Sequence, residues 1–474
     1  NRPQPQPYPA MSKRFLQIAR SMPDQGFSEA QVEAFKRLYL AWKKQSQSQL
    51  DWAEVKSPPE EAVLHYEDFA EVDTERARDL LSKLAVCRLN GGLGTSMGCV
   101  GPKSGIEVRG GETFMDLIVT QIRRLNEVYG SAVPLVLMNS FATDSDTKKM
   151  IRRYEDELEI YCFTQNEFPR LRVDSNLPML KVRHPGQYSY PPGHGDFYDS
   201  FTQSGILDQL LSAGKEYLFV GNADNLGASV DLKILAQMDK SGVPFIMEVT
   251  PKTRADVKGG TLVKTPDAHL QLLEIAQVPK DYVEEFKSVK KFKIFNTNNV
   301  WINLKAMKAK YDQGGMELEV IVNKKTVNHV PVIQLETAIG GGMKCFEGAK
   351  AVKVPRSRFL PVKKTDDLLL VQSNLFVLKD GVLVKNPERQ FEGLPLIRLG
   401  AYFQDLEAYA ERFEEIPDIL ELDLLTIVGD LRFGKNVTLR GNVILVCEQG
   451  SLTLPEGTVL ENKVMTGSIK MGEL

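Results

Sequence analysis

The sequence predicts an α/β protein in which a doubly wound, mostly parallel sheet follows a helical segment and precedes a short β-helix. Three observations predict this arrangement. Apolar residues recur at three- and four-residue spacing early in the chain, and short apolar runs alternate with helical segments from Leu84 onward. Near the C-terminus, apolar residues recur every six positions. The 474 residues correspond to about three domains at roughly 150 residues each.

The first 80 residues are predicted to be a tail and a helical segment. Residues 1–10 carry proline at alternate positions, which is typical of an extended or disordered tail. Ser28 is placed to cap a helix whose apolar side comprises Val32, Phe35, Leu38, Tyr39 and Trp42. A second helix is expected over residues 73–83.

The middle of the chain alternates between strands and helices. A strand over 85–89 leads into a glycine-rich loop at 90–101, and a helix over 112–129 precedes a buried strand at 134–138. Thr143 and Asp144 are expected to cap the next helix. The alternation continues with a strand at 160–163, helix at 205–212, strand at 217–221, helix at 232–240 and strand at 244–249. Repeated βαβ units predict a doubly wound sheet.

The C-terminal part has a period of six. Two series of apolar residues share this spacing, namely Ile427, Phe433, Leu439, Leu445 and Leu431, Val437, Val443. Gly429, Gly434 and Gly441 lie between them. A period of six fits a hexapeptide β-helix, in which each short rung stacks on the last. The alternative is an irregular β-sheet tail, and the fading register after Cys447 indicates only a few coils.

Composition excludes several classes of protein. With 59 Lys and Arg against 62 Asp and Glu, the net charge of −3 argues against a globally basic nucleic-acid binder and a strongly acidic disordered chain. Five scattered cysteines and five dispersed histidines argue against a disulfide framework, a zinc cluster or a histidine metal cage. No stretch approaches the ~18 apolar residues of a membrane span. No signal peptide is visible, so we expect a cytoplasmic protein without nucleic-acid or membrane partners.

The glycine-rich loop and its flanks, LNGGLGTSMGCVGPKS at 89–104, form the most informative segment. Glycines after a strand let backbone N–H groups approach a phosphate. A Walker A loop is disfavoured because Pro102 separates Gly101 from Lys103. A dinucleotide fingerprint is weak because Gly92, Gly94 and Gly98 give G-x-G-x-x-x-G. A tight turn without a ligand is a poor alternative, and a triphosphate loop served by Lys103 fits best.

This segment closely resembles the signature of the UDP-glucose pyrophosphorylase family, also called UTP–glucose-1-phosphate uridylyltransferases. The Gly-Gln-Gly-Thr-Arg pattern usual in UDP-N-acetylglucosamine pyrophosphorylases is absent. Further family-like segments occur in order: PPGHGD at 191–196, GNADNLG at 221–227, LEIAQVP at 273–279, FKIFNTNNVWINL at 292–304 and RFLPVKKTDDLLLVQS at 358–373. The resemblance implies a Rossmann-like, GT-A-like nucleotidyltransferase core with a mixed, mostly parallel sheet over residues 81–390. It also implies a left-handed β-helix domain over 391–474.

The implied reaction is in-line attack by glucose-1-phosphate on the α-phosphorus of UTP, which forms UDP-glucose and pyrophosphate reversibly with the help of Mg²⁺. The resemblance makes Lys103 and Lys363 the catalytic cations. The residues alone leave Lys363 and Lys364 open, since Pro361 favours an extended segment whose side chains alternate between two faces. The resemblance selects Lys363.

The resemblance also implies three sets of binding residues. The UTP set is Leu89, Asn90, Gly91, Gly92, Lys103, Gln165, Gly193 and Lys363. The glucose-1-phosphate set is His194, Asn222, Gly260, Glu274 and Asn298, with the choice among Asn296, Asn298 and Asn299 open. Asp224, after a strand, is the Mg²⁺ ligand, which suits a hard cation that takes few protein carboxylates.

Other functions remain as alternatives. A broad-specificity UDP-sugar or UDP-N-acetylhexosamine pyrophosphorylase shares the chemistry. A non-catalytic scaffold subunit is disfavoured because Lys103, Asp224 and Lys363 are all present. A nicotinamide dehydrogenase would require a better dinucleotide fingerprint. The short β-helix slightly favours a monomer, and self-association through its exposed end is the alternative.

Overall fold

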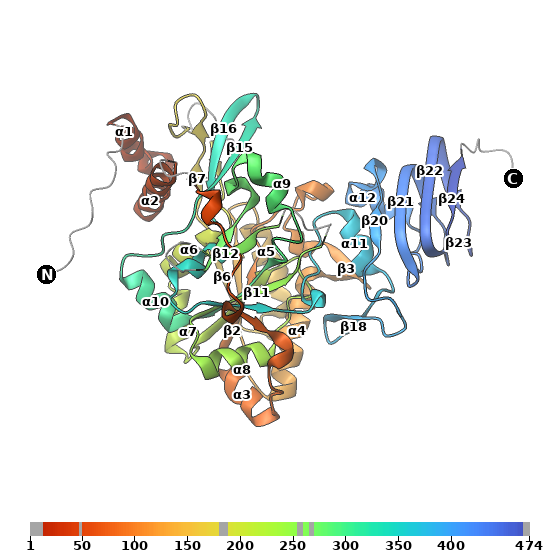
Figure 1. Cartoon of the computed structure of the whole chain (residues 1–474), viewed down its shortest axis with the longest axis horizontal. Coiled ribbons are helices and arrows are strands. Elements are labelled where there is room, and N and C mark those ends of the chain that lie inside the picture. Colours follow the sequence, from red (N-terminus) through yellow and green to blue (C-terminus); the bar gives the residue numbers. More distant parts are fainter. Residues whose placement is uncertain (1–12, 47–49, 180–187, 254–258, 265–269, 468–474) are drawn as a thin grey trace.

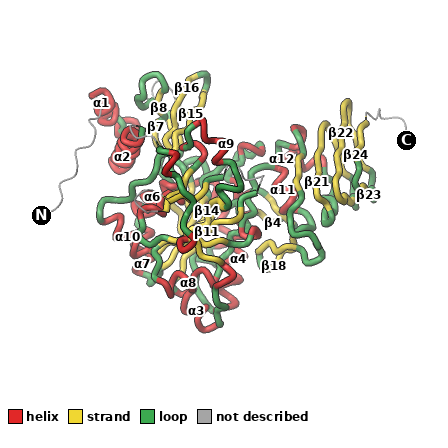
Figure 2. Tube along the Cα trace, viewed as in Figure 1, coloured by secondary structure: helices red, strands yellow, loops and turns green. Residues whose placement is uncertain are grey.

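The computed structural model describes residues 13–46, 50–179, 188–253, 259–264 and 270–467. An α/β body occupies the centre, two N-terminal helices lie on one side, and a stack of strands extends on the other (Figure 1). In Figure 2 the strands of the body form a central layer that helices surround. The proline-rich tail predicted at residues 1–10 lies outside the described residues.

The body is built on an eight-stranded sheet with the order β1-β17-β11-β14-β10-β2-β5-β6. β14 is antiparallel to its neighbours β10 and β11, and the other described pairs of this sheet are parallel. The predicted mixed, mostly parallel sheet is therefore confirmed. The strands are β1 Val63–His65, β17 Lys350–Lys353, β11 Phe245–Pro251, β14 Ile294–Asn303, β10 Tyr217–Asn222, β2 Leu84–Leu89, β5 Leu135–Asn139 and β6 Ile160–Thr164.

Helices cover both faces of this sheet. Successive residues of a strand point to opposite faces, so apolar side chains lie on both faces and need to be covered. In β2, Val86 joins one buried core and Ala85 and Cys87 join the other. The first core contains residues of α3 Thr74–Ser82, α4 Phe114–Tyr129 and α8 Leu232–Ser241. The second contains residues of α6 Phe197–Gln203, α7 Ile206–Ser212 and α10 Leu304–Asp312. The doubly wound arrangement follows from this alternation.

The N-terminal helices α1 Lys13–Ser21 and α2 Glu29–Gln45 pack on a smaller sheet of β15 Ile321–Val327, β16 Val330–Glu336 and β8 Leu171–Arg172. Ser28 caps α2 and exchanges hydrogen bonds with Gln31, as a capping box does. The ring centroids of Phe35 and Phe168 lie 5.5 Å apart. The helical segment was predicted, but the strand β1 within it was missed.

The C-terminal strands pair in parallel throughout the described residues. They are β20 Leu396–Arg398, β21 Leu422–Phe433, β22 Thr438–Leu454, β23 Val459–Glu461 and β24 Val464–Gly467. Leu425 pairs with Val443 and Ile444 pairs with Val464, so the chain returns repeatedly beside its earlier course. All seven apolar residues of the predicted six-residue repeat are buried.

Two local predictions need correction. The helix expected from Glu112 begins at Phe114, because Thr113 is its N-cap and Glu112–Thr113 forms β4 opposite β3 Glu107–Arg109. Thr143 is the N-cap residue of α5 Asp144–Ile151, as predicted, but its side chain makes no capping hydrogen bond, and its hydroxyl donates to the carbonyl of Asn90 at 2.9 Å. The remaining strands and α-helices are β7 Phe168–Pro169, β9 Ser189–Tyr190, β12 Thr261–Lys264, β13 Leu270–Leu273, α9 Val283–Phe286, α11 Thr365–Gln372, β18 Phe376–Lys379, β19 Val382–Lys385 and α12 Leu406–Arg412.

Candidate active site

The predicted site residues gather at one edge of the main sheet. Leu89 at the end of β2 pairs with Asn222 at the end of β10, so the segments that follow both strands leave from the same edge. Gln165 follows β6 at the same edge, since β2, β5 and β6 are parallel. Ligands of doubly wound sheets bind beyond these carboxyl ends.

The glycine-rich loop closes on its own start. The Lys103 N–H donates to the Gly92 carbonyl at 3.1 Å, and Leu93 bridges Pro102. The carbonyls of Gly91 and Gly92 are engaged, by Ser140 and Lys103 respectively. Their N–H groups donate no hydrogen bond within the described residues. They are therefore two of the donors that the loop can offer to an anion.

Asn90 holds this loop on the sheet. Its side chain donates to Asn139 and Thr147, its N–H donates to the Met138 carbonyl, and its own carbonyl accepts from Thr143. The residue is buried. The sequence predicts that the backbone of Asn90 lines the nucleotide, and in the structure its N–H, its carbonyl and its Nδ2 also anchor the loop.

Lys103 and Asp224 form an ion pair, with Lys103 Nζ 2.5 Å from Asp224 Oδ2. Both side chains are largely buried, with 17% and 16% of their surface exposed. Asp224 Oδ1 is buried and has no hydrogen-bond partner among the described residues. An unpartnered buried carboxylate oxygen is costly unless a cation or donor satisfies it. The arrangement therefore fits a divalent cation that Asp224 shares with a bound substrate.

Lys363 is brought to the same place by two neighbouring segments. Val362 N–H donates to the Asp224 carbonyl at 3.2 Å, and the Ser96 hydroxyl of the glycine-rich loop donates to the Lys363 carbonyl at 3.1 Å. The carboxylate of Asp367 accepts from the backbone N–H groups of both Lys363 and Lys364. The structure thus gathers Lys103, Asp224 and Lys363, as the sequence predicted.

Asn225 was missed by sequence reasoning, yet it links these segments. Its Oδ1 accepts from Leu360 N–H at 2.8 Å, and its Nδ2 donates to the Arg358 carbonyl at 3.2 Å. Arg358 in turn donates two hydrogen bonds, of 2.6 and 2.7 Å, to the fully buried Glu248. Burial disfavours the charge of Arg358, but Glu248, together with Asp231 and Tyr66, raises the pKa of Arg358. The only available signal was the position of Asn225 next to Asp224.

The charge of Lys363 shifts the pKa values of both His194 and Glu274. Burial, and then the charge of Lys363, lower the pKa of His194 to about 4. His194 Nδ1 accepts from Ile339 N–H at 2.9 Å, so the proton of the neutral ring lies on Nε2. Burial raises the pKa of Glu274, and Lys363 opposes this shift. A Cβ on Gly260 would lie 2.6 Å from Glu274 Oε1, so these two predicted residues are neighbours.

The structure distinguishes the three asparagines of β14. Asn299 is buried and donates to Glu248 at 3.1 Å, and Asn296 is buried and bonded to Asn298. Asn298 is partly exposed and has φ +62°, in the left-handed region, where β14 shifts register against β11. Asn298, the predicted choice, is therefore the most accessible of the three.

Gln165 lies against the glycine-rich loop. A Cβ on Gly91 would lie 2.2 Å from Gln165 Nε2, and Gln165 Oε1 is buried without a hydrogen-bond partner among the described residues. Gly193 was predicted to permit close approach to a base. In the structure it has φ +84° and a Cβ there would lie 2.8 Å from the Thr337 carbonyl, so packing against Thr337 already requires a glycine.

A protein-built metal cage is not part of this site. Among the described residues, no three His, Cys, Asp or Glu side chains are grouped closely enough to hold a metal ion. Within the same residues, no helix has the length and apolar character needed to span a bilayer.

The comparisons with known proteins agree with this geometry. The sequence model of the UTP–glucose-1-phosphate uridylyltransferase family matches residues 32–440. The chain belongs to this family. The UTP–glucose-1-phosphate uridylyltransferase 2 of Dictyostelium discoideum is 48% identical over 470 residues, which cover 98% of this chain and 93% of that relative. The uridylyltransferase of Hordeum vulgare is 50% identical over 445 residues, covering 93% and 94%.

The fold of the family is also confirmed by a solved structure. A mutant UDP-glucose pyrophosphorylase from Leishmania major, in complex with UDP-glucose, superimposes with a TM-score of 0.86 at 30% identity. The match covers 97% of this chain and all of the other. The resemblance recognised in the glycine-rich loop is therefore confirmed over nearly the whole sequence.

Proposed function

We propose that this protein transfers the uridylyl group of UTP to glucose-1-phosphate and releases pyrophosphate in a reversible reaction. One observation carries the proposal: Lys103, Asp224 and Lys363 converge at the carboxyl edge of the sheet in a chain of this family. The names of its relatives and the UDP-glucose in the Leishmania major structure support the choice of substrates.

The transfer requires two anions to be held in line while their repulsion is neutralised. The free N–H groups of Gly91 and Gly92 donate to the nucleotide. Lys103 leaves its ion pair with Asp224 and binds the triphosphate instead. Lys363, which is exposed in the structure, stabilises the charge that develops at the α-phosphate, because a cation held beside the reacting phosphate acts on such charge. The hydrogen bonds of Val362 and Ser96 fix the backbone of Lys363 for this role.

Asp224 is the residue that would hold Mg²⁺, through the oxygen that lacks a partner. When bound, Mg²⁺ neutralises phosphate charge and polarises the phosphoryl oxygens. This charge adds to that of the two lysines.

The remaining residues divide between base and sugar. The Gln165 amide can donate and accept at once, as the imide edge of uracil requires. Glu274, with Gly260 beside it, accepts from sugar hydroxyls, and Asn298 contacts the same sugar. The His194 Nε2–H donates to the sugar phosphate, and Asn222 contacts the same group. A neutral, donating imidazole is consistent with the lowered pKa of His194.

The catalytic role is assigned to a Rossmann-like domain at 81–390, and residues 391–474 are inferred to form a left-handed β-helix. The parallel pairing of β21 with β22 and the buried six-residue repeat support the β-helix. The short stack favours a monomer.

A pyrophosphate-release assay tests the function. UTP with Mg²⁺ is offered to glucose-1-phosphate, galactose-1-phosphate and N-acetylglucosamine-1-phosphate. We expect kcat/KM for glucose-1-phosphate to exceed the other two by more than about tenfold. A preference for the acetamido sugar, or comparable rates with all three, would assign the protein to one of the alternative pyrophosphorylases. If no sugar phosphate caused release of pyrophosphate, the non-catalytic scaffold subunit would be the remaining alternative.

A further inference from the structure

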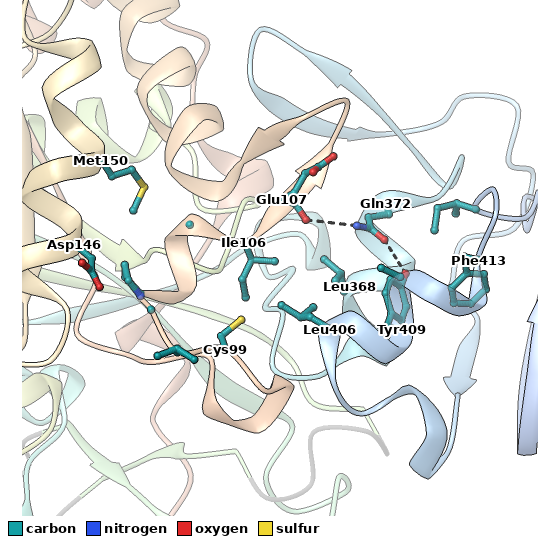
Figure 3. A pocket seen from close by; sticks show the side chains of 16 residues that line it. Cys99, Ile106, Glu107, Asp146, Met150, Leu368, Gln372, Leu406, Tyr409 and Phe413 are labelled. Atoms are coloured by element: carbon teal, nitrogen blue, oxygen red, sulfur yellow. Dashed lines mark hydrogen bonds between the residues drawn. The ribbon is translucent and has the colours of Figure 1, made fainter.

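A cavity of about 710 Å³ lies between the glycine-rich loop and the helices that follow the main body (Figure 3). Its walls come from residues 99–102 and 105–107, from Asp146 and Met150 of α5, from Leu368 and Gln372 of α11, and from five residues between 406 and 416. None of the residues assigned above to UTP, glucose-1-phosphate or Mg²⁺ lines it. Its volume lies within the range of about 300–1,000 Å³ that small-molecule sites occupy.

The lining selects for an apolar occupant with a hydrogen-bonding group. Apolar side chains dominate it, namely Ile106, Met150, Leu368, Leu406, Phe413 and Ile416. A polar element crosses one wall, where the Tyr409 hydroxyl donates to Gln372 Oε1 at 2.7 Å (Figure 3). Gln372 Nε2 is 3.5 Å from the Glu107 carbonyl, which is a weak hydrogen bond. This amide can therefore donate to a ligand.

The charge of the lining disfavours anions. Its sixteen described residues include two carboxylates, Glu107 and Asp146, and no lysine, arginine or histidine. Glu107 accepts from Gly111 N–H, and Asp146 pairs with Lys149 at 3.2 Å. Neither contact brings a cationic side chain into the lining. Phosphorylated substrates are thus poor candidates, whereas a neutral or cationic molecule fits.

The cavity adjoins the segments that carry both catalytic lysines. Residues 99–102 lead directly into Lys103, and α11 begins at Thr365, just after Lys363. The α12 side also contacts the loop closely, since a Cβ on Gly98 would lie 1.7 Å from the carboxylate of Asp405. An occupant would therefore touch the loop, α11 and α12 together.

We propose that this cavity is an effector site for a small organic molecule with an apolar body and a neutral or cationic polar group. A molecule bound there stabilises the glycine-rich loop in the arrangement that pairs Lys103 with Asp224. Since Lys103 must leave Asp224 to bind the triphosphate, the occupant weakens UTP binding. Ligand binding does not depend on the function proposed above, whereas the effect on UTP rests on it.

Binding is tested on the full chain by calorimetry with 1-naphthylmethylamine, and with 1-naphthalenesulfonate as the anionic counterpart. We expect one amine site per chain and at least about tenfold weaker binding of the sulfonate. Ala410→Trp, which places an indole in the cavity wall, should weaken amine binding about tenfold, and Ala401→Trp, an exposed control outside the cavity, should leave it unchanged. Met150→Trp fills the opposite wall and replaces Ala410→Trp if that variant does not fold.

The effect on UTP is measured as KM for UTP against amine concentration. We expect KM to rise about threefold or more and then reach a plateau, as coupling between distinct sites requires. A rise without a plateau would place the amine in the nucleotide site and overturn the proposal. The proposal would also be overturned if Ala410→Trp and Ala401→Trp bound the amine with equal affinity. Equal affinity of the wild-type chain for the amine and the sulfonate would overturn it as well. An enzyme that binds the amine as predicted but makes no UDP-glucose would refute only the proposed function.

Discussion

Lys103 Nζ and Asp224 Oδ2 lie 2.5 Å apart, and this pair joins the glycine-rich loop to the end of β10. The lysine is the proposed cation for the triphosphate, and the carboxylate is the proposed Mg²⁺ ligand. The same pair therefore brings the two main charges of the site together. Asp224 Oδ1 stays unpartnered within the described residues, which leaves one oxygen for the metal ion.

The first prediction concerns Asp224→Asn. An amide keeps the shape but lacks the charge that attracts Mg²⁺, so we expect kcat/KM to fall about 10²- to 10³-fold. The Mg²⁺ concentration for half-maximal activity should rise as well. A magnesium titration of pyrophosphate release measures both, with the exposed Asp68→Asn as a control. An unchanged Mg²⁺ dependence in Asp224→Asn would contradict the metal role.

The second prediction separates two adjacent lysines. The charge of Lys363 reaches His194 and Glu274, so Lys363→Ala should lower kcat about 10²- to 10³-fold. Lys364→Ala removes an equal charge one residue away and should change kcat less than about threefold. Steady-state kinetics of both variants decide the assignment. The reverse pattern would transfer the catalytic role to Lys364.

The third prediction concerns Asn225, whose amide ties Leu360 and Arg358 to the Asp224 turn. Asn225→Ala should loosen the segment that carries Lys363 and lower kcat about tenfold. Because it acts through Lys363, the same change in a Lys363→Ala background should lower kcat less than about twofold. A double-mutant cycle measures this coupling. Equal losses in both backgrounds would show that Asn225 acts independently of Lys363.

The sequence predicted the elements whose signals are local. Capping by Ser28, the alternation from β2 to β11 and the six-residue repeat all depend on neighbours within one turn or rung. The glycine-rich loop was also predictable, because a triphosphate site needs backbone donors and a lysine in one short segment. The predictions of the fold class and of the family both rested on these features.

What the sequence missed depends on contacts between distant segments. The roles of Asn225 and Arg358 become visible only when Glu248 is folded beneath them. Threonine is a common helix-capping residue, but the hydroxyl of Thr143 donates to the buried carbonyl of Asn90 instead. The choice among the asparagines of β14 likewise followed from burial and from the partners of Asn296 and Asn299. Local patterns hold no information on such pairs.

The fourth prediction uses two adjacent glycines. A Cβ on Gly91 would lie 2.2 Å from Gln165 Nε2, whereas a Cβ on Gly92 meets nothing within 4 Å. Gly91→Ala should therefore displace the flexible Gln165 side chain and raise KM for UTP about tenfold. Gly92→Ala should leave KM nearly unchanged. Since only a side-chain end must move, we expect little change in Tm for either variant. Equal KM values would remove Gln165 from the base site.

The last prediction is a pH dependence of stability. Burial, and then Lys363, lower the pKa of His194 to about 4 in the folded state. In the unfolded chain a histidine titrates near 6.5, so the unfolded state binds more protons between these values. The free energy of unfolding should therefore fall as pH decreases, by up to about 2 kcal/mol from pH 7 to pH 5 for this group. His194→Gln removes that contribution, and the exposed His65→Gln serves as the matched control. Urea unfolding at both pH values measures the difference. A His194→Gln protein with the wild-type slope would show that His194 takes up its proton in the folded state, and its proposed role as a neutral Nε2 donor would fail with it.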